Sequence, residues 1–158
     1  MALGRAVQLA LKSLSIPESD DPLLVLVLID SEGQCPAKLA LNLLDVARSV
    51  DPRVDVACVL AHVMYETWFV AAAESLSEYL RLEPGENLPQ DPEASGYGSS
   101  WVVKRFIEGP KYRKTQHQPA MTQAMDLNRC RAVSPSFDKL CRELEKKFRQ
   151  EGREVVRS

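Results

Sequence analysis

Long hydrophobic runs are scarce in this sequence, and the longest extends only from Leu23 to Ile29. Such a run is far too short to cross a bilayer, so the sequence predicts no membrane-spanning helix. The opening stretch, MALGRAVQLALK, also lacks the continuous apolar core and the cleavage site of a secretory signal. We therefore expect a cytoplasmic protein that does not associate with membranes.

The sequence also lacks a large excess of either positive or negative charge. The 158 residues include 20 Lys and Arg and 22 Asp and Glu, which gives a net charge of −2. This balance does not indicate a nucleic-acid-binding protein, and any such role must rest on a local cluster of cations. The hydrophobic content of 45% is ordinary for a globular protein, so we expect one domain over residues 1–158 with a core of its own.

Cysteine motifs that bind metal are absent. The four cysteines are Cys35, Cys58, Cys130 and Cys141; none forms a C-x-x-C pair, and their spacing matches no zinc site. We expect buried, reduced thiols.

Apolar runs and helical periodicity predict an alternation of strands and helices in the first half of the chain. The expected elements are a helix over 4–14, a strand over 22–29, a helix over 36–50, a strand over 54–61 and a helix over about 63–80 that breaks near Ser75. Neither strand shows polar alternation, which is typical of central parallel strands. The alternation predicts an α/β fold with a small, mostly parallel sheet covered by helices on both faces; the three-layer order is what the family resemblance described below implies.

The second half of the chain begins with a long segment rich in Pro, Gly, Ser and acid. We expect a loop over residues 81–100, either as a lid or as a disordered stretch. A short helix over 101–107 should follow, then an irregular stretch over 108–119 and a helical turn over 121–125. The C-terminal helix, over 134–150, should begin with Ser134 as its N-cap and pack against the sheet.

Carboxylates follow the first predicted strand, and further polar residues follow the second. Asp30 and Glu32 end the first strand, whereas His62 and then Glu66 come after the second. Ligands of parallel sheets bind at the carboxyl ends of the strands, so we expect these four side chains at one edge. Asp30 and Glu32 would hold Mg²⁺, with Glu66 and His62 as catalytic groups. Alternatively, the acids shape a turn, Glu66 stabilises a helix start, and His62 is a structural partner of Glu66.

A basic segment with interleaved aromatic residues lies further along the chain. Its candidate phosphate-binding or nucleic-acid-binding residues are Lys104, Lys111, Arg113 and Lys114, and its aromatic residues are Trp101, Phe106 and Tyr112. Such a mixture suits contact with a phosphate backbone and stacking on bases, and it equally describes a solvated loop beside a core. His117 and Gln118 follow and are predicted to reach the acidic edge.

Three stretches carry a family resemblance: LIDSEGQCPAKLALNLLDVAR, VACVLAHVMYETWFVAAAESL and YRKTQHQPAMTQAMDLNRCRAVSPSFDKLCREL. Together they resemble the bacterial domain-of-unknown-function 4276 family (DUF4276), whose members look like small Toprim-type proteins. Toprim domains bind Mg²⁺ through acids and act on phosphodiesters. The resemblance implies that Asp30 and Glu32 match the Asp-x-Asp step, with Glu in place of the second Asp. It also implies that Glu66 and Trp68 match the second block of the family.

One departure from the family pattern affects the expected function. The strand and glutamate that usually precede the first helix are not found here, so the metal site of this chain is expected to be incomplete. The resemblance implies a Mg²⁺-dependent, nuclease-like protein that processes nucleic acid. The alternatives are a non-catalytic partner subunit of an ATPase in bacterial defence or genome maintenance, or a shortened product without activity alone. A two-stranded sheet has unpaired edges, so we also expect a homodimer or a partner strand.

Overall fold

The computed structural model of the chain describes residues 5, 9, 24–32, 35–50, 55–94 and 97–150. Of the helix expected over 4–14, Arg5 and Leu9 are described and are helical, and its other residues lie outside the described ones. No helix in the described part of the chain is long and apolar enough to span a bilayer.

Two parallel strands form the sheet. β1 (Leu24–Asp30) pairs with β2 (Asp55–Ala61) in a register that runs from Leu24 opposite Asp55 to Asp30 opposite Ala61. The crossover between them contains α2 (Pro36–Val50). The prediction of an α/β chain with a small parallel sheet is therefore confirmed, and both strands agree with the predicted ranges to within two residues.

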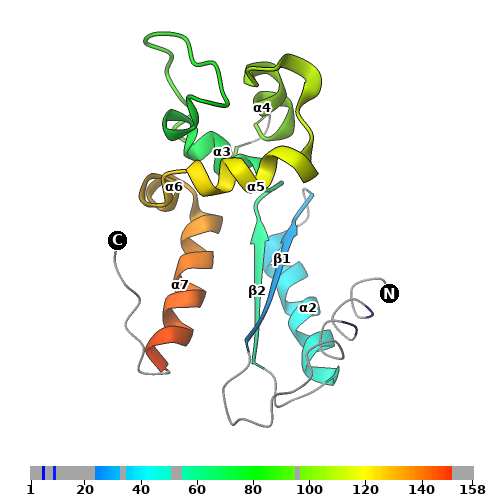
Figure 1. Ribbon diagram of the computed structural model, residues 1–158. Helices are drawn as coiled ribbons and strands as arrows, with labels where there is room; N and C mark the ends of the chain where they lie inside the picture. The colour runs from blue at the N-terminus through cyan, green and yellow to red at the C-terminus, as the bar shows by residue number, and fades with distance from the viewer. Residues whose placement is uncertain are drawn as a thin grey trace.

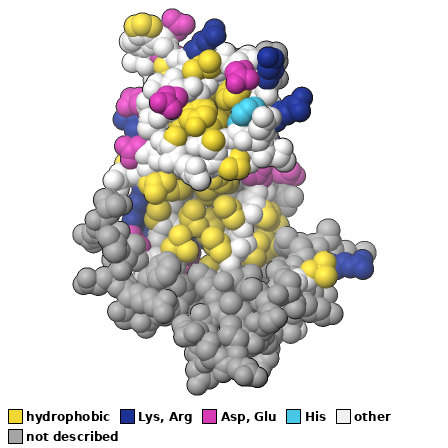
Figure 2. Space-filling view, viewed as in Figure 1, with side chains coloured by type: hydrophobic (Ala, Val, Ile, Leu, Met, Phe, Trp, Pro, Cys, Tyr) yellow, Lys and Arg dark blue, Asp and Glu magenta, His cyan; other side chains and the backbone are white. Residues whose placement is uncertain are grey.

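The two strands lie between α2 and the C-terminal helix α7 (Pro135–Gln150) in Figure 1. Ala40 and Leu43 of α2 pack against Cys58 and Leu60 of β2 in one apolar cluster, and α7 contacts β2. This confirms that the last helix packs against the sheet. In the described part of the chain β1 pairs only with β2, and Figure 2 shows hydrophobic side chains gathered over the middle of the viewed face.

The remaining helices gather beyond the carboxyl ends of the strands (Figure 1). They are α3 (Glu66–Ala71), the 3₁₀ helix η1 (Ala73–Leu76), α4 (Ser99–Arg105), the 3₁₀ helix η2 (Gly109–Lys111), α5 (Lys114–Ala124) and α6 (Leu127–Val133). A second, larger cluster holds them together, and Trp68, Phe69, Leu76, Val102 and Met121 in it are almost completely buried. This helical part therefore covers the edge of the sheet where the candidate site residues were predicted.

The predicted bounds of two helices were wrong. The helix expected over about 63–80 begins at Glu66 and ends at Ala71, and the 3₁₀ helix that follows contains Ser75, where a break was predicted. Ser75 donates to the carbonyl of Ala72 and accepts the N–H of Asp126 at the start of α6. The stretch expected to be irregular over 108–119 is helical from Lys114 onward, with Pro119 inside the helix. Tertiary contacts outweigh local propensity at both places.

The thiols only partly follow the prediction. All four cysteines are free, as expected, and Cys58 and Cys130 are buried. Cys141 is half-buried, whereas Cys35 is exposed. Cys35 immediately precedes α2, where the N–H groups of Lys38 and Ala37 lower the pKa of its thiol.

Candidate functional site

The ends of the two strands are tied together beyond the sheet. The N–H of Ser31 donates to the carbonyl of Ala61 at 3.0 Å, and the N–H of Glu32 donates to the carbonyl of Val63 at 3.0 Å. The hydroxyl of Ser31 accepts the N–H of Val63 at 2.9 Å. Val63 has a φ of 61°, which is strained for a β-branched residue, and the surrounding bonds keep it there. The two turns after the strands therefore form one connected unit.

Asp30 lies at the base of this unit and bonds directly to the start of α3. Its Oδ1 accepts the N–H of Tyr65 at 2.7 Å. Burial raises the pKa of the Asp30 carboxyl; the bond from Tyr65 and the charge of Lys114 oppose the rise, and the charges of Glu66 and then Glu32 add to it. The structure thus places Asp30 and Glu66 at one edge, as the sequence predicted.

Glu66 is the first residue of α3 and is fully buried. Its Oε1 accepts hydrogen bonds from the Tyr112 hydroxyl at 3.3 Å and from Nε2 of Gln118 at 3.1 Å. The ammonium of Lys114 lies 3.2 Å from Oε2. Burial and the charge of Glu66 raise the pKa of the Tyr112 hydroxyl, so this hydroxyl stays protonated and can donate. One segment, residues 112–118, therefore supplies all three partners of a buried carboxylate.

The arrangement can be tested against the needs of a divalent cation. Asp30 bonds to the residue before the buried Glu66, whereas Glu32, the predicted second ligand, is exposed. Among the described residues, no group of three or more acidic, His or Cys side chains could hold a metal ion. Mg²⁺ often takes one or two carboxylates and completes its shell with water and phosphate. Oε2 of Glu66 is buried and accepts no hydrogen bond, so the pair fits such a shared site but not an all-protein cage.

His62 lies at the same edge but faces a different carboxylate. Its Nδ1 is 3.1 Å from the backbone oxygen of Glu93 and 4.0 Å from Oε2 of the same residue. A carbonyl can only accept, so Nδ1 carries the proton in the neutral ring, and Nε2 keeps its lone pair. The alternative in which His62 is a partner of Glu66 is therefore not supported, because the side-chain contacts of His62 in the described structure go to Glu93.

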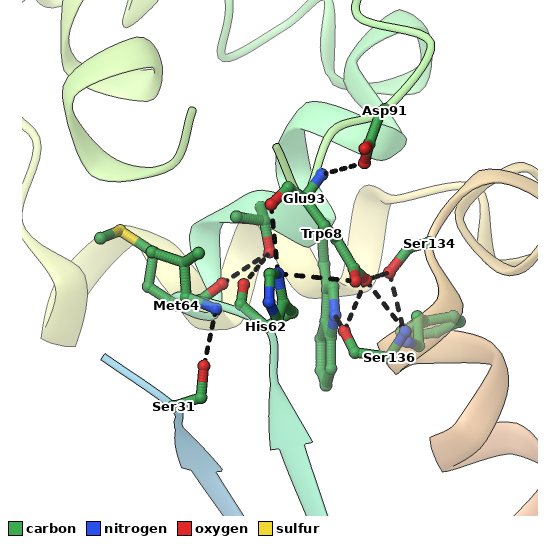
Figure 3. A network of polar contacts seen from close by, with 11 residues as sticks. Ser31, His62, Met64, Trp68, Asp91, Glu93, Ser134 and Ser136 are labelled. Carbon is green, nitrogen blue, oxygen red and sulfur yellow. Dashed lines mark hydrogen bonds and ion pairs between the residues drawn. The ribbon is translucent and has the colours of Figure 1, made fainter. Parts of the chain in front are cut away.

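Glu93 is the centre of a polar network that sequence reasoning missed (Figure 3). Its Oε1 accepts from the N–H of Ser136 at 2.9 Å, from the Ser136 hydroxyl at 2.7 Å and from the Ser134 hydroxyl. The indole of Trp68 donates to the Ser136 hydroxyl at 2.8 Å. A buried carboxylate at the first turn of α7 satisfies free N–H groups there. The described part of the predicted loop over 81–100 is therefore fastened to α7 at this point.

The basic segment supplies charge but not stacking surfaces. Lys104, Lys111 and Arg113 are exposed, whereas Trp101 and Phe106 are buried in the core. Of the two interpretations of this segment, stacking of bases on Trp101 and Phe106 is disfavoured, because the core covers both rings. Gln118 reaches the acidic edge as expected. His117 does not, since its Nδ1 accepts the N–H of Arg113 at 2.9 Å.

Comparison with known proteins identifies the family. A family model described as "Domain of unknown function (DUF4276)" matches residues 4–145. The chain belongs to this family. The DUF4276 match spans the acidic edge, the segment that closes over Glu66 and the first turns of α7. No curated protein and no solved structure matches the chain.

Proposed function

We propose that this DUF4276 protein binds a divalent cation such as Mg²⁺ at Asp30 and Glu66 and hydrolyses phosphodiesters of nucleic acids, in the manner of Toprim-type proteins. The observation that carries the proposal is the fully buried carboxylate of Glu66 beside the Asp30–Tyr65 hydrogen bond: its Oε2 accepts no hydrogen bond, and the half-exposed ammonium of Lys114 at 3.2 Å is the positive charge that compensates it. A buried carboxylate oxygen without a donor is costly unless a positive charge compensates it. We also propose that the chain is similar to Toprim-type proteins and shares their three-layer order.

The residues of the chain have distinct roles in this proposal. When bound, a divalent cation polarises a phosphoryl oxygen or makes bound water more acidic. Asp30 and Glu66 hold the ion, and the bonds from Tyr112 and Gln118 fix the orientation of Glu66. Lys114 lies beside the site and neutralises the charge of a phosphate.

Exposed cations on the same segment support a polyanionic substrate. Lys111 and Arg113 flank Tyr112 and are exposed. They bring positive charge to the edge of the site although the whole chain carries a net charge of −2. Because Trp101 and Phe106 are buried and the half-buried Tyr112 bonds to Glu66, we expect contacts to the phosphate backbone without base stacking.

A non-catalytic partner subunit of an ATPase is the second candidate. It is favoured by the small number of acids, since the described residues bring two close carboxylates to the edge and no larger cluster of possible ligands. In this case the protein would bind nucleic acid or its partner without cleaving a bond.

Titration with Mg²⁺ and Mn²⁺ tests the first proposal. Saturation at about 100 times Kd should raise the free energy of unfolding by about 3 kcal/mol. Asp30→Asn should remove this gain, and the control Asp45→Asn, at an exposed position on α2, should keep it. Cleavage of labelled single- and double-stranded DNA should depend on the cation and disappear in Asp30→Asn. Binding of the cation without cleavage would favour the second candidate, and a missing gain in the wild type would refute the site.

A further inference from the structure

The two oxygens of the Glu66 carboxylate have different surroundings. Oε1 accepts from two neutral donors, Tyr112 and Gln118. Oε2 accepts no hydrogen bond, although the ammonium of Lys114 lies 3.2 Å away at ion-pair distance. The neutral donors therefore hold one half of the carboxylate, and a cation alone compensates the other half.

Lys114 differs from the other partners of Glu66 in its freedom to move. Its side chain is 50% exposed, whereas the side chain of Glu66 is completely buried. Lys114 is the first residue of α5, so its side chain can leave Glu66 without disturbing the body of the helix. The long stem of lysine is flexible and its ammonium is readily hydrated, so the ion pair can open toward solvent.

We propose that Lys114 is an exchangeable counter-ion, which a divalent cation displaces from Oε2 of Glu66 and which then turns to a phosphate of the substrate. This inference rests on the proposed function, because it uses the same cation site. Two positive groups at one buried carboxylate oxygen repel each other, so a bound divalent cation and the ammonium of Lys114 compete for Oε2. The ion of higher charge replaces the ammonium at Oε2, while Tyr112 and Gln118 keep Oε1 in place. Lys114 thus protects the buried charge before the cation arrives and becomes available to an anion afterwards.

Calorimetric titration with MgCl₂ and MnCl₂ alone tests the exchange without any measurement of activity. The wild type is compared with Lys114→Met, which removes the competing charge and keeps the length of the side chain. We expect the Kd of Lys114→Met to be about three- to tenfold lower, as befits a partly exposed ion pair. Lys146→Met is the matched control, since it removes an exposed charge from α7, outside the segment that contacts Glu66. Its Kd should stay within about twofold of the wild-type value.

Chemical labelling of the wild type provides a second readout that needs no variant. Acetylation by an amine-reactive ester, followed by peptide mass spectrometry, measures the reactivity of each lysine. The reactivity of Lys114 should rise severalfold on saturation with Mg²⁺, because its ammonium leaves the carboxylate. The reactivity of Lys111 should stay constant.

The outcomes separate this inference from the proposed function. A wild type that binds neither ion overturns both. Binding that Asp30→Asn abolishes but Lys114→Met leaves unchanged or weakens overturns the exchange alone. Unchanged labelling of Lys114 at saturation also overturns it. Tighter binding in Lys114→Met together with faster labelling of Lys114 in the wild type supports it.

Discussion

Replacement of Glu93 by alanine tests the network that fastens the loop to α7. The side chain of Glu93 is buried, and one oxygen receives three hydrogen bonds from Ser134 and Ser136. The two hydroxyls can turn to other acceptors after the change, whereas the N–H of Ser136 cannot. A hydrogen bond to a charged group contributes about 1.5–3 kcal/mol, and a small cavity adds to the loss. We therefore expect Glu93→Ala to lower the free energy of unfolding by about 2–4 kcal/mol.

Urea unfolding followed by tryptophan fluorescence measures this loss, since Trp68 is buried and donates to Ser136 within the network. For a chain of this size the same change should lower Tm by roughly 5–15 °C. Glu93→Gln keeps one acceptor oxygen and should lose about half as much stability. Glu78→Ala, at an exposed position, is the surface control and should stay within about 0.5 kcal/mol of the wild type. A Glu93→Ala protein as stable as this control would refute the network.

Three further predictions follow from single positions. Gly98→Ala should lower the free energy of thermal unfolding by about 2 kcal/mol or more, because φ is +112° and the new Cβ would lie 2.5 Å from Sδ of Met64. Gly85→Ala, where φ is +77° and no atom lies within 4 Å, should cost less. Equal losses in the two variants would contradict the clash. Burial raises the pKa of Asp30 above its ordinary value of 3.8, so the folded state holds this proton more tightly and loses stability as pH rises from about 4. The free energy of unfolding of Asp30→Asn in urea, relative to that of the wild type, should therefore rise between about pH 4 and pH 7. A difference between the two proteins that stays constant with pH would contradict the raised pKa of Asp30. A thiol reagent should modify Cys35 first and reach Cys58 and Cys130 only after denaturation. The fast phase of modification should be lost in Cys35→Ser. A fast phase that persists in this variant would show another exposed thiol.

The acidic edge was predictable because its geometry depends on short-range rules. Neither strand carries polar residues inside, so both were recognisable as buried, and a single helix between them makes the pairing parallel. Once the strands are adjacent, Asp30 and Glu66 follow strand ends that meet at one edge of the sheet. The edge that these two acids share was therefore predictable, whereas their spacing depends on the hydrogen bonds between the two turns.

The partners of Glu66 could not be predicted with the same rules. Tyr112 and Gln118 lie 46 and 52 positions further along the chain, and no periodic pattern links them to α3. The segment around them was predicted to be irregular, since Pro119 usually argues against a helix. Only packing against the core decides that α5 forms there and presents Lys114 to the site.

Glu93 was missed for a different reason. It lies among prolines and acids in a stretch typical of a solvated loop, where an isolated glutamate carries no signal. The available clue was the sequence Ser-Pro-Ser at the start of α7, because the first turn of a helix has free N–H groups that need an acceptor. The Ser-Pro-Ser sequence predicts that a hydrogen-bond acceptor lies near these N–H groups, but it does not identify Glu93 as that acceptor.

The hydrogen bonds between the turns that follow β1 and β2 set the spacing of Asp30 and Glu66: two join main-chain groups, and the side chains of Ser31 and Asp30 accept two more main-chain N–H groups. A ligand at these acids would find its anchor points already assembled, with little ordering entropy left to lose. For the same reason, lengthening either turn by one residue would uncouple the acids while both remain in the sequence, so relatives of this chain should vary in length elsewhere.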